Sequence, residues 1–340
     1  MSLTHISLKR FTAFESLELP LSEGLNVFIG ANGTGKTHLM KVAYSACDVS
    51  KTRKGFAEKL VRVFLPSRDA IGRLVKRRGQ SSHGQVAVYR GARKLSVQFS
   101  NHAKRADSTR VVGMAKWTGE PVESVYIPVK EMLSNAPGFR ALYSQREIHY
   151  EEVYADLLDR AYLPIKTGPR DKARQRLLEI LREVMAGKVE VKDEEFFLRS
   201  PKGNLEFSLL AEGMRKLALL WILIQNGTLT SGSVLFWDEP ETNLNPRLFG
   251  VLMDILLELQ RNGVQVFLAT HDYVVLKELE LRREKSDNVA FHSLYADDES
   301  GGDIVCHTSD SYGAIHPNAI AEAFGDIYDR DVRRSLGGKL

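Results

Sequence analysis

Residues 30–37 are the segment that most constrains what this chain can fold into. They read Gly-Ala-Asn-Gly-Thr-Gly-Lys-Thr and satisfy the pattern G-x-x-x-x-G-K-[ST] at every fixed position. Residues 25–29 are a short apolar run suited to a buried strand, and residues 36–46 can follow as a helix. This order of strand, loop and helix is what a phosphate-binding loop (P-loop) requires. The alternative is a chance glycine-rich turn.

The chemistry of the loop suggests a role for each kind of residue in it. Glycines let backbone N–H groups turn toward phosphate oxygens. Lys36 would reach the β and γ phosphates of a nucleotide, and the Thr37 hydroxyl would bind Mg²⁺. The predicted nucleotide-binding residues of this segment are Gly30, Ala31, Asn32, Gly33, Thr34, Gly35, Lys36 and Thr37.

Size and composition limit the class of protein. A chain of 340 residues is too long for one compact core, so we expect one large domain with an insertion, or two domains. Its N-terminus has no continuous apolar stretch, and its longest apolar run, residues 217–224, is too short to span a bilayer. We therefore expect a cytoplasmic protein without a membrane partner. Cys47 and Cys306 lack the spacing of a zinc site or a disulfide framework and are expected to be buried thiols.

Helices and apolar strands alternate in the C-terminal part of the chain. The predicted elements are a helix over residues 213–225, a strand over 234–237, a helix over 246–260 and a strand over 264–269. This alternation indicates an α/β fold with a mostly parallel central sheet. We predict one nucleotide-binding core built from residues 1–46 and 200–340, with a β-rich N-terminal region. Residues 47–199 would be an insertion, first a basic β-hairpin segment and then a mainly helical lobe.

Two carboxylates follow the predicted strand at residues 234–237. At the carboxyl end of a strand Asp238 would hold Mg²⁺, and Glu239 would orient or deprotonate the water that attacks the γ phosphate. An acidic pair after a strand is weak evidence alone, because helix N-termini are enriched in such residues. Its position after a P-loop in the same chain strengthens the interpretation as a Walker B motif.

A histidine follows the next predicted strand. His271 comes after residues 264–269, so its imidazole would reach the same sheet edge as the two earlier motifs. A neutral imidazole there could accept or donate at the γ phosphate and hold the attacking water. A lone histidine after a strand is more often a solvated or capping residue, but three motifs in one order favour a catalytic role.

With these motifs the chain resembles the ATP-binding-cassette (ABC) class of ATPases, and within it the RecF, SMC and OLD-like branch of AAA-type ATP-binding proteins. The match rests on residues 30–37, 238–241, 244–246 and 269–272, together with residues 8–14, which resemble the first strand and turn of that branch. The resemblance covers roughly residues 1–46 and 205–310. It implies an ABC-type P-loop ATPase head that binds ATP and Mg²⁺ and hydrolyses ATP.

The resemblance also implies a second head as a partner. In this class two heads close on ATP, as a homodimer or a higher oligomer, and the signature sequence of one completes the site of the other. The closest counterpart here is residues 210–216, which places Glu212 and Gly213 as nucleotide-binding residues. Ala211 stands where a serine would contact the γ phosphate, and Glu212 replaces a glycine. The alternative is that these residues simply begin a helix.

Two other parts of the site are less defined. Residues 125–131 lie where the branch places its Q-loop; no glutamine is present, and Lys130 or Glu131 could substitute. Phe11 and Phe14 are candidates for packing against the adenine, although aromatic residues in such a strand more often belong to the core.

Residues 51–110 carry 16 basic and three acidic residues, although the whole chain has a net charge of only +4. The residues that we expect to contact a polyanion are Arg73, Lys76, Arg77 and Arg78, followed by Arg90, Arg93 and Lys94 on a hairpin. Such a cluster could neutralise several phosphates of duplex DNA. A protein partner or a solvated face are the alternatives.

Three functions remain open from the sequence. The first is an ATPase whose ATP-driven pairing drives or gates a separate effector protein; the resemblance implies a role in bacterial anti-phage defence. The second is a RecF-like DNA-binding clamp in repair or recombination, which the basic segment favours. The third is an ATP-binding scaffold with little hydrolysis. No nuclease or TOPRIM-like block is evident after His271.

Overall fold

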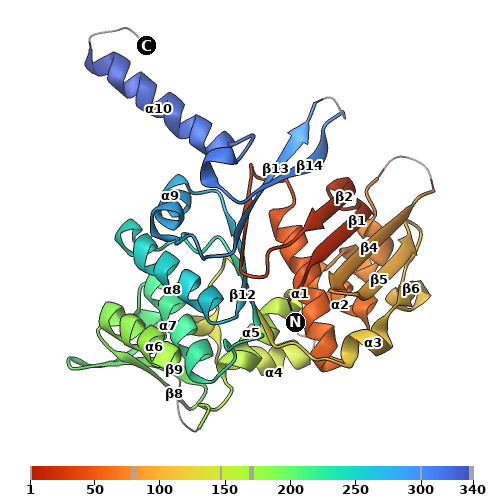
Figure 1. The fold of residues 1–340 in the computed structure, drawn as a ribbon. Helices are drawn as coiled ribbons and strands as arrows, with labels where there is room; N and C mark the ends of the chain where they lie inside the picture. The colour runs from red at the N-terminus through yellow and green to blue at the C-terminus, as the bar shows by residue number, and fades with distance from the viewer. Residues whose placement is uncertain (1, 78–80, 146–147, 168–171, 299–300, 337–340) are drawn as a thin grey trace.

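The protein is built around two large sheets with one helix between them. The computed structural model describes residues 2–77, 81–145, 148–167, 172–298 and 301–336. Helix α1 (Lys36–Thr52) lies between a five-stranded sheet and a six-stranded sheet (Figure 1). Residues 39–50 of this helix are all buried, so α1 is a core helix and ends six residues later than the sequence predicts. The P-loop immediately precedes it.

The six-stranded sheet confirms the mostly parallel architecture. Its order is β14 (Asp303–Ser309), β13 (Val289–Asp297), β3 (Leu25–Ile29), β12 (Gln265–Thr270), β11 (Val234–Asp238) and β7 (Ser124–Ile127). All neighbours pair in parallel except β14, which is antiparallel to β13 at one edge. Every residue of β3, β7, β11 and β12 is buried, as expected for a parallel sheet covered on both faces.

The other sheets are antiparallel. The five-stranded sheet has the order β2 (Phe14–Pro20), β1 (His5–Phe11), β4 (His83–Arg90), β5 (Arg93–Ser100) and β6 (Arg110–Val112). A three-stranded sheet consists of β10 (Gly203–Glu206), β9 (Glu195–Ser200) and β8 (Lys188–Lys192). The predicted basic hairpin is present as β4–β5, and β9–β10 forms another hairpin.

The predicted insertion is interwoven with the core. Strand β4 pairs with β1 of the N-terminal region, and β7 pairs with β11 of the central sheet. Residues 47–199 therefore contribute strands to both large sheets, and do not form a lobe attached at one point. The physical reason is that β1 and β11 each have a free edge that another strand must cover. The division of the chain into a split core and an insertion remains our prediction about its organisation.

The helices cover the remaining faces. They are α2 (Phe56–Phe64), α3 (Met114–Thr118), α4 (Phe139–Ser144), α5 (Glu152–Ala161), α6 (Lys172–Met185), α7 (Glu212–Gln225), α8 (Phe249–Arg261), α9 (Tyr273–Arg282) and α10 (Ala319–Ser335). Helices α7 and α8 lie on the side of the central sheet opposite α1, and α10 projects away from the body (Figure 1). Among the described residues, no helix combines the length and apolar character needed to span a bilayer.

Helix α2 was missed by the sequence analysis, which expects only a basic stretch there. Phe56, Leu60 and Val63 are fully buried and lie at the i, i+4, i+7 spacing of an amphipathic helix. The Lys and Arg residues between them hid this pattern. The helix packs against α1 and brings one of its lysines into the core.

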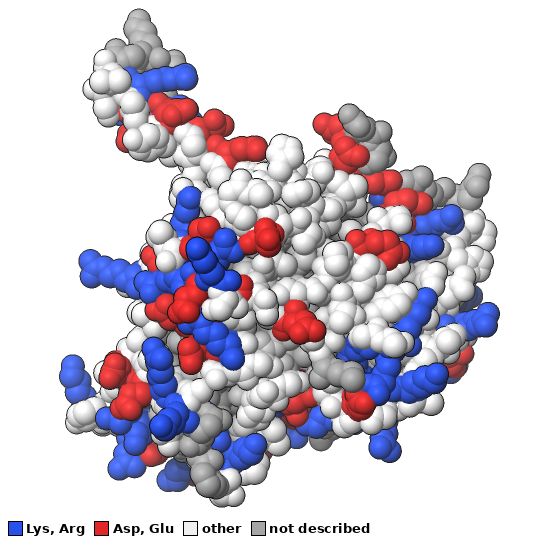
Figure 2. Space-filling model, viewed as in Figure 1, with Lys and Arg blue, Asp and Glu red and all other residues white. Residues whose placement is uncertain are grey.

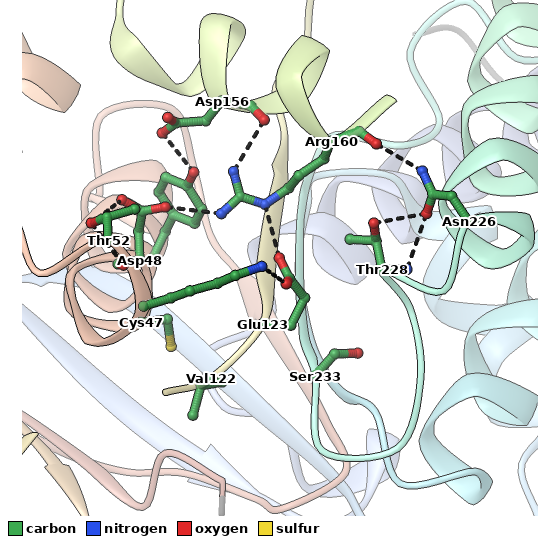
Figure 3. Close-up of polar contacts among 12 residues, drawn as sticks. Cys47, Asp48, Thr52, Val122, Glu123, Asp156, Arg160, Asn226, Thr228 and Ser233 are labelled. Atoms are coloured by element: carbon green, nitrogen blue, oxygen red, sulfur yellow. Dashed lines mark hydrogen bonds and ion pairs between the residues drawn. The ribbon is translucent and has the colours of Figure 1, made fainter. Parts of the chain in front are cut away.

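A buried network of charges joins α1 to α2 and α5. Arg160 of α5 extends to two carboxylates, with Nη2 2.9 Å from Asp48 Oδ1 and Nε 3.3 Å from Glu123 Oε1 (Figure 3). Asp48 also lies 2.8 Å from the Nζ of Lys59, which is fully buried. Burial opposes the charge of Lys59, but Asp156 and Asp48 outweigh burial and raise its pKa. These pairs fix the helix that follows the P-loop.

We expect Lys59→Met to destabilise the fold strongly. The substitution leaves Asp48 and Asp156 buried without their shared cation, and breaking a buried pair in this way costs about 3–5 kcal/mol. Lys51→Met is the matched control, because Lys51 pairs with Glu123 at a site where its side chain is half exposed; its cost is about 0–1 kcal/mol. Urea denaturation measures both, and equal losses would contradict the assigned role of Lys59.

A second buried titratable group lies in the central sheet. His292 of β13 is fully buried; its Nε2 lies 3.1 Å from Asn26 Oδ1 and its Nδ1 lies 2.9 Å from Thr308 Oγ1. Because the Asn26 oxygen only accepts, the neutral ring donates from Nε2 and accepts the Thr308 hydroxyl at Nδ1. Burial lowers the pKa of His292 from 6.5 to about 3.

His292 makes the stability of the fold depend on pH. The unfolded chain takes up a proton near pH 6.5, whereas the folded chain does not until about pH 3. The contribution of neutral His292 is therefore present above pH 6.5 and is lost as the pH falls, by up to about 1.4 kcal/mol per pH unit. We expect His292→Gln to flatten the stability curve between pH 7.5 and 5 in urea titrations. His307→Gln, an exposed histidine on β14, is the control and keeps the wild-type slope.

Candidate active site

Three parallel strands bring the predicted motifs to one edge of the central sheet. Strand β12 pairs with β3 on one side, where Thr270 is opposite Ile29, and with β11 on the other, where Ala269 is opposite Asp238. The P-loop follows β3, the two carboxylates follow β11, and the histidine follows β12. Because all three strands run in the same direction, their carboxyl ends lie side by side.

The backbone conformation and the space around each residue explain why glycine occupies three positions of the P-loop. Gly30, Gly33 and Gly35 all have positive φ angles, of 147°, 85° and 91°. A Cβ atom at Gly33 would meet nothing within 4 Å, whereas one at Gly35 would lie 2.5 Å from Cζ of Phe14. Phe14 thus packs directly beneath the loop. Phe11 and Phe14 are both fully buried in the core with α1, which confirms the core interpretation of these two residues.

Lys36 is held over the P-loop by backbone oxygens. Its Nζ donates to the carbonyl of Gly30 at 2.7 Å and to that of Ala31 at 3.0 Å, and the residue is 6% exposed. Burial lowers the pKa of Lys36, although Glu239 and Asp238 oppose this shift. Within the same loop Thr34 Oγ1 donates to the Ala31 carbonyl at 2.9 Å, and Asn32 is exposed.

The two predicted metal ligands meet. Thr37 Oγ1 donates to Asp238 Oδ2 at 2.9 Å, and the hydroxyl of Tyr126 donates to the same oxygen at 3.1 Å. Asp238 is 3% exposed, and burial raises its pKa, partly offset by the two hydroxyls. A carboxylate and a hydroxyl beside a P-loop are the oxygen donors that Mg²⁺ takes, so these residues fit that ion. Tyr126, on β7, is a site residue that sequence analysis missed.

Glu239 and His271 form the exposed part of the site. Nδ1 of His271 lies 3.3 Å from Oε1 of Glu239, and their side chains are 47% and 26% exposed. Glu239 has a φ of 47°, an uncommon conformation for a residue other than glycine, and its N–H donates to the Ala269 carbonyl at 2.9 Å. Strained backbone of this kind costs about 1–3 kcal/mol and concentrates at functional sites.

Glu241 is a second residue that sequence analysis missed. Its side chain is buried; Oε1 accepts a hydrogen bond from Thr270 Oγ1 at 2.7 Å and one from the His271 N–H at 3.3 Å. Burial raises the pKa of Glu241, and these hydrogen bonds oppose the shift. A third carboxylate two residues after Glu239 was the available sequence signal.

The predicted signature residues contact the loop that follows the Walker B carboxylates. Glu212 and Gly213 begin α7, and Oε2 of Glu212 accepts from Nδ2 of Asn243 at 2.9 Å. A Cβ at Gly213 would lie 2.7 Å from the Asn243 carbonyl oxygen, so close packing requires glycine there. The structure thus brings these two residues to Asn243 and Leu244; it does not bring them to the P-loop of the same chain.

Glu131 contacts α7. Its Oε2 lies 2.5 Å from Nε of Arg215, its side chain is 2% exposed, and it also accepts hydrogen bonds from the Leu133 N–H and the Ser134 hydroxyl. Burial raises its pKa, opposed by Arg215. This placement gives Glu131 a structural partner, so it does not support the suggested substitution for a Q-loop glutamine. Lys130, the other candidate, is exposed.

Comparison with solved structures shows the fold. The chain matches an SmcHead bound to the C-winged helix domain of ScpA with a TM-score of 0.59 and 12% identity, covering 92% of this chain and 99% of that one. It matches an Smc head with an extended coiled coil, bound to the C-terminal domain of ScpA derived from Pyrococcus furiosus, with a TM-score of 0.55 and 13% identity. That match covers 97% of this chain and 99% of the other.

Curated relatives share part of the sequence. The DNA replication and repair protein RecF of Klebsiella pneumoniae is 30% identical over 123 residues, 35% of this chain and 34% of that protein. The RecF protein of Listeria welshimeri is 29% identical over 151 residues, 44% of this chain and 38% of that protein. The chain spans about a third of the length of these relatives.

A family model covers most of the chain. Residues 25–277 match the AAA_21 family, described as "AAA domain, putative AbiEii toxin, Type IV TA system". The matched range includes the P-loop, both Walker B carboxylates and His271. Because this range is more than half of the chain, the chain belongs to the AAA_21 family, and it has the fold of an Smc head with the three motifs at one sheet edge.

Proposed function

We propose that the chain binds ATP with Mg²⁺ and hydrolyses it at the edge formed by β3, β11 and β12. The observation that carries this proposal is the meeting of four predicted groups from distant parts of the sequence: Thr37 on Asp238, and His271 on Glu239. Each pair joins segments brought together only by parallel strand pairing.

The surroundings of each site residue suggest its role in ATP binding and hydrolysis. Lys36 would move its donors from the loop carbonyls to the β and γ phosphates, and the P-loop N–H groups would bind the same phosphates. Mg²⁺ held by Thr37 and Asp238 would neutralise charge on those phosphates. Glu239, exposed enough to meet water, would take its proton, and His271 would hold that water in line.

A second head is the proposed partner. Glu212 and Gly213 contact Asn243 and Leu244, which leaves their proposed nucleotide contact to a second copy of the chain. We propose that ATP-driven pairing, as a homodimer or higher oligomer, drives or gates a separate effector in the bacterial cytoplasm. Anti-phage defence is the proposed process, supported by the sequence resemblance and by the reference to a putative toxin in the family description.

Glu239→Gln tests hydrolysis and pairing together. Loss of the general base lowers kcat roughly 10²- to 10⁴-fold. The amide keeps the size of the side chain, so we expect ATP binding to persist and the ATP-bound paired form to accumulate in light-scattering chromatography. Glu322→Gln, an exposed carboxylate on α10, is the control and keeps wild-type turnover. If the wild-type chain hydrolyses ATP no faster than Glu239→Gln, the hydrolase proposal is contradicted, and the alternative of an ATP-binding scaffold with little hydrolysis is favoured.

A RecF-like DNA-binding function is the second candidate. In the structure, acids from elsewhere in the chain neutralise much of the basic segment. Lys59 is buried among carboxylates, Arg93 pairs with Glu120, and Lys76 lies 2.5 Å from Asp303. Arg90 is buried against the ring of Trp117 and donates to the backbone carbonyls of Trp117 and Glu120.

The predicted polyanion-binding set is therefore not one surface. Strand β4 runs from His83 to Arg90, a distance of about 23 Å along the strand. Arg73 lies near the His83 end, whereas Arg90 lies at the opposite end, where the hairpin turns. Arg73 and Arg77 are exposed, and Arg78 lies outside the described residues. Of the predicted residues, Lys94 is also exposed, but at the opposite end from these two.

A groove with basic walls lies at the His83 end of the five-stranded sheet. It has a volume of about 630 Å³, and among its lining residues His83, His102, Lys104, Arg105 and Arg110 are basic and none is acidic. Lys104, Arg105 and Arg110 are exposed. Figure 2 shows Lys and Arg gathered toward the edges of the drawn face, including the edge that carries this sheet, with few in the middle. This groove favours a phosphodiester partner over a solvated face.

We expect replacement of Lys104, Arg105 and Arg110 by Gln to weaken binding of a 25-base-pair duplex and to reduce its salt dependence. Each lost phosphate contact makes the slope of log Kobs against log salt shallower by roughly 0.9. The matched control replaces Arg330, Arg333 and Arg334 on α10 by Gln and removes the same charge elsewhere. Equal slopes for the wild type and both triple variants would remove the groove as a phosphate-binding surface.

A further inference from the structure

Glu241 connects two of the strand ends that form the site. It lies in the loop that follows β11, and its Oε1 accepts from the side chain and the backbone of two consecutive residues at the end of β12, Thr270 and His271. The same oxygen is 4.0 Å from Nδ1 of His271. A single oxygen of Glu241 therefore binds the backbone of His271 and also lies close to its imidazole ring.

The other oxygen of this carboxylate has no hydrogen-bond partner among the described residues. Oε2 is buried, and the side chain is 6% exposed. A half-satisfied buried carboxylate is unfavourable for folding, and an apolar residue would fill such a position at lower cost. The position of Glu241 is thus explained by what Oε1 holds, not by a contribution to the core.

The loop that carries Glu241 is itself held from the opposite side. Lys216 of α7 is buried and donates from Nζ to the Thr242 carbonyl at 2.6 Å and to the Glu239 carbonyl at 3.4 Å. Glu239 therefore has a backbone contact to α7, and Glu241 has contacts to β12. The loop cannot shift without disturbing one of these supports, so the Glu241 contacts set the position of His271 relative to Glu239.

We propose that Glu241 is a positioning residue for ATP hydrolysis: by holding Thr270 and the His271 N–H, it keeps the imidazole beside the Glu239 carboxylate. The inference rests on the proposed function. Glu241 touches neither the nucleotide nor the attacking water in this scheme; it acts through His271. The expected signature is a change in turnover without a matching change in ATP affinity.

The first experiment separates turnover from binding in the full chain. We expect Glu241→Ala to lower kcat on the order of 10²-fold, as displacement of a catalytic group by about 1 Å does, with the Kd of a fluorescent ATP analogue changed less than about threefold. Glu241→Gln retains an oxygen acceptor at the same place and should recover at least tenfold of the lost turnover. A Glu241→Ala variant with wild-type kcat would overturn the proposal.

Thr270→Val isolates one of the two hydrogen bonds. It removes the hydroxyl that donates to Glu241, and we expect an intermediate fall in kcat. Thr228→Val is the matched control, since its buried hydroxyl donates to Asn226 Oδ1 at 2.8 Å, outside the site. Equal effects of the two valine variants on kcat would overturn the proposal, because any buried threonine would then behave alike.

A double-mutant cycle distinguishes positioning from general support of the fold. If Glu241 acts through His271, adding Glu241→Ala to His271→Ala lowers kcat no further, whereas independent effects multiply. If the two losses of kcat multiply, the positioning role is overturned. The proposed function still stands in that case, provided that the wild-type chain hydrolyses ATP faster than Glu239→Gln. A wild-type chain that does not hydrolyse ATP would overturn both.

Discussion

The parallel pairing of β3, β12 and β11 is the constraint on which the rest of the structure depends. Its register places Ile29, Thr270 and Asp238 at the same edge, and each is followed by a functional segment. A shift of one residue in either pairing would turn every side chain of the shifted strand to the other face. Along β3, Val27 and Phe28 belong to two different cores, so both cores hold this register. The site is thus positioned by the apolar packing on both faces of its strands.

Sequence predicts the parts of the site that are local in the chain. The P-loop, the Walker B pair and His271 each follow a recognisable strand, and parallel strands bring their ends together. Tyr126 and Glu241 could not be found in this way, because their significance lies in contacts with Asp238 and with Thr270, made only after folding. Element boundaries differ for a similar reason: α1 continues beyond residue 46 because α2 and α3 pack against it and residues 47–50 are buried.

Charge is the property that sequence windows represent least well. The excess of basic residues in residues 51–110 suggests one large cationic surface, but ion pairs form between residues distant in sequence. Lys59 pairs with Asp156, which is 97 residues away in the sequence, and Lys76 pairs with Asp303, which is 227 residues away. The exposed cations Lys104, Arg105 and Arg110 line one groove, and of these Arg105 also pairs with Asp107. Helix α2 accounts for part of the difference, because it buries Lys59.

Two buried lysines on neighbouring helices, Lys59 and Lys36, differ in how far nearby anions compensate their charge. Lys59 is surrounded by Asp48, Asp156 and Glu152, and these anions raise its pKa in spite of burial. Lys36 is buried as well, but its hydrogen bonds go to two carbonyl oxygens, and burial lowers its pKa. The charge of Lys59 is therefore compensated within the fold, whereas that of Lys36 is not fully compensated. A polyphosphate placed in the P-loop would supply the missing anion, and this difference in compensation is the electrostatic preorganisation that ATP binding would use.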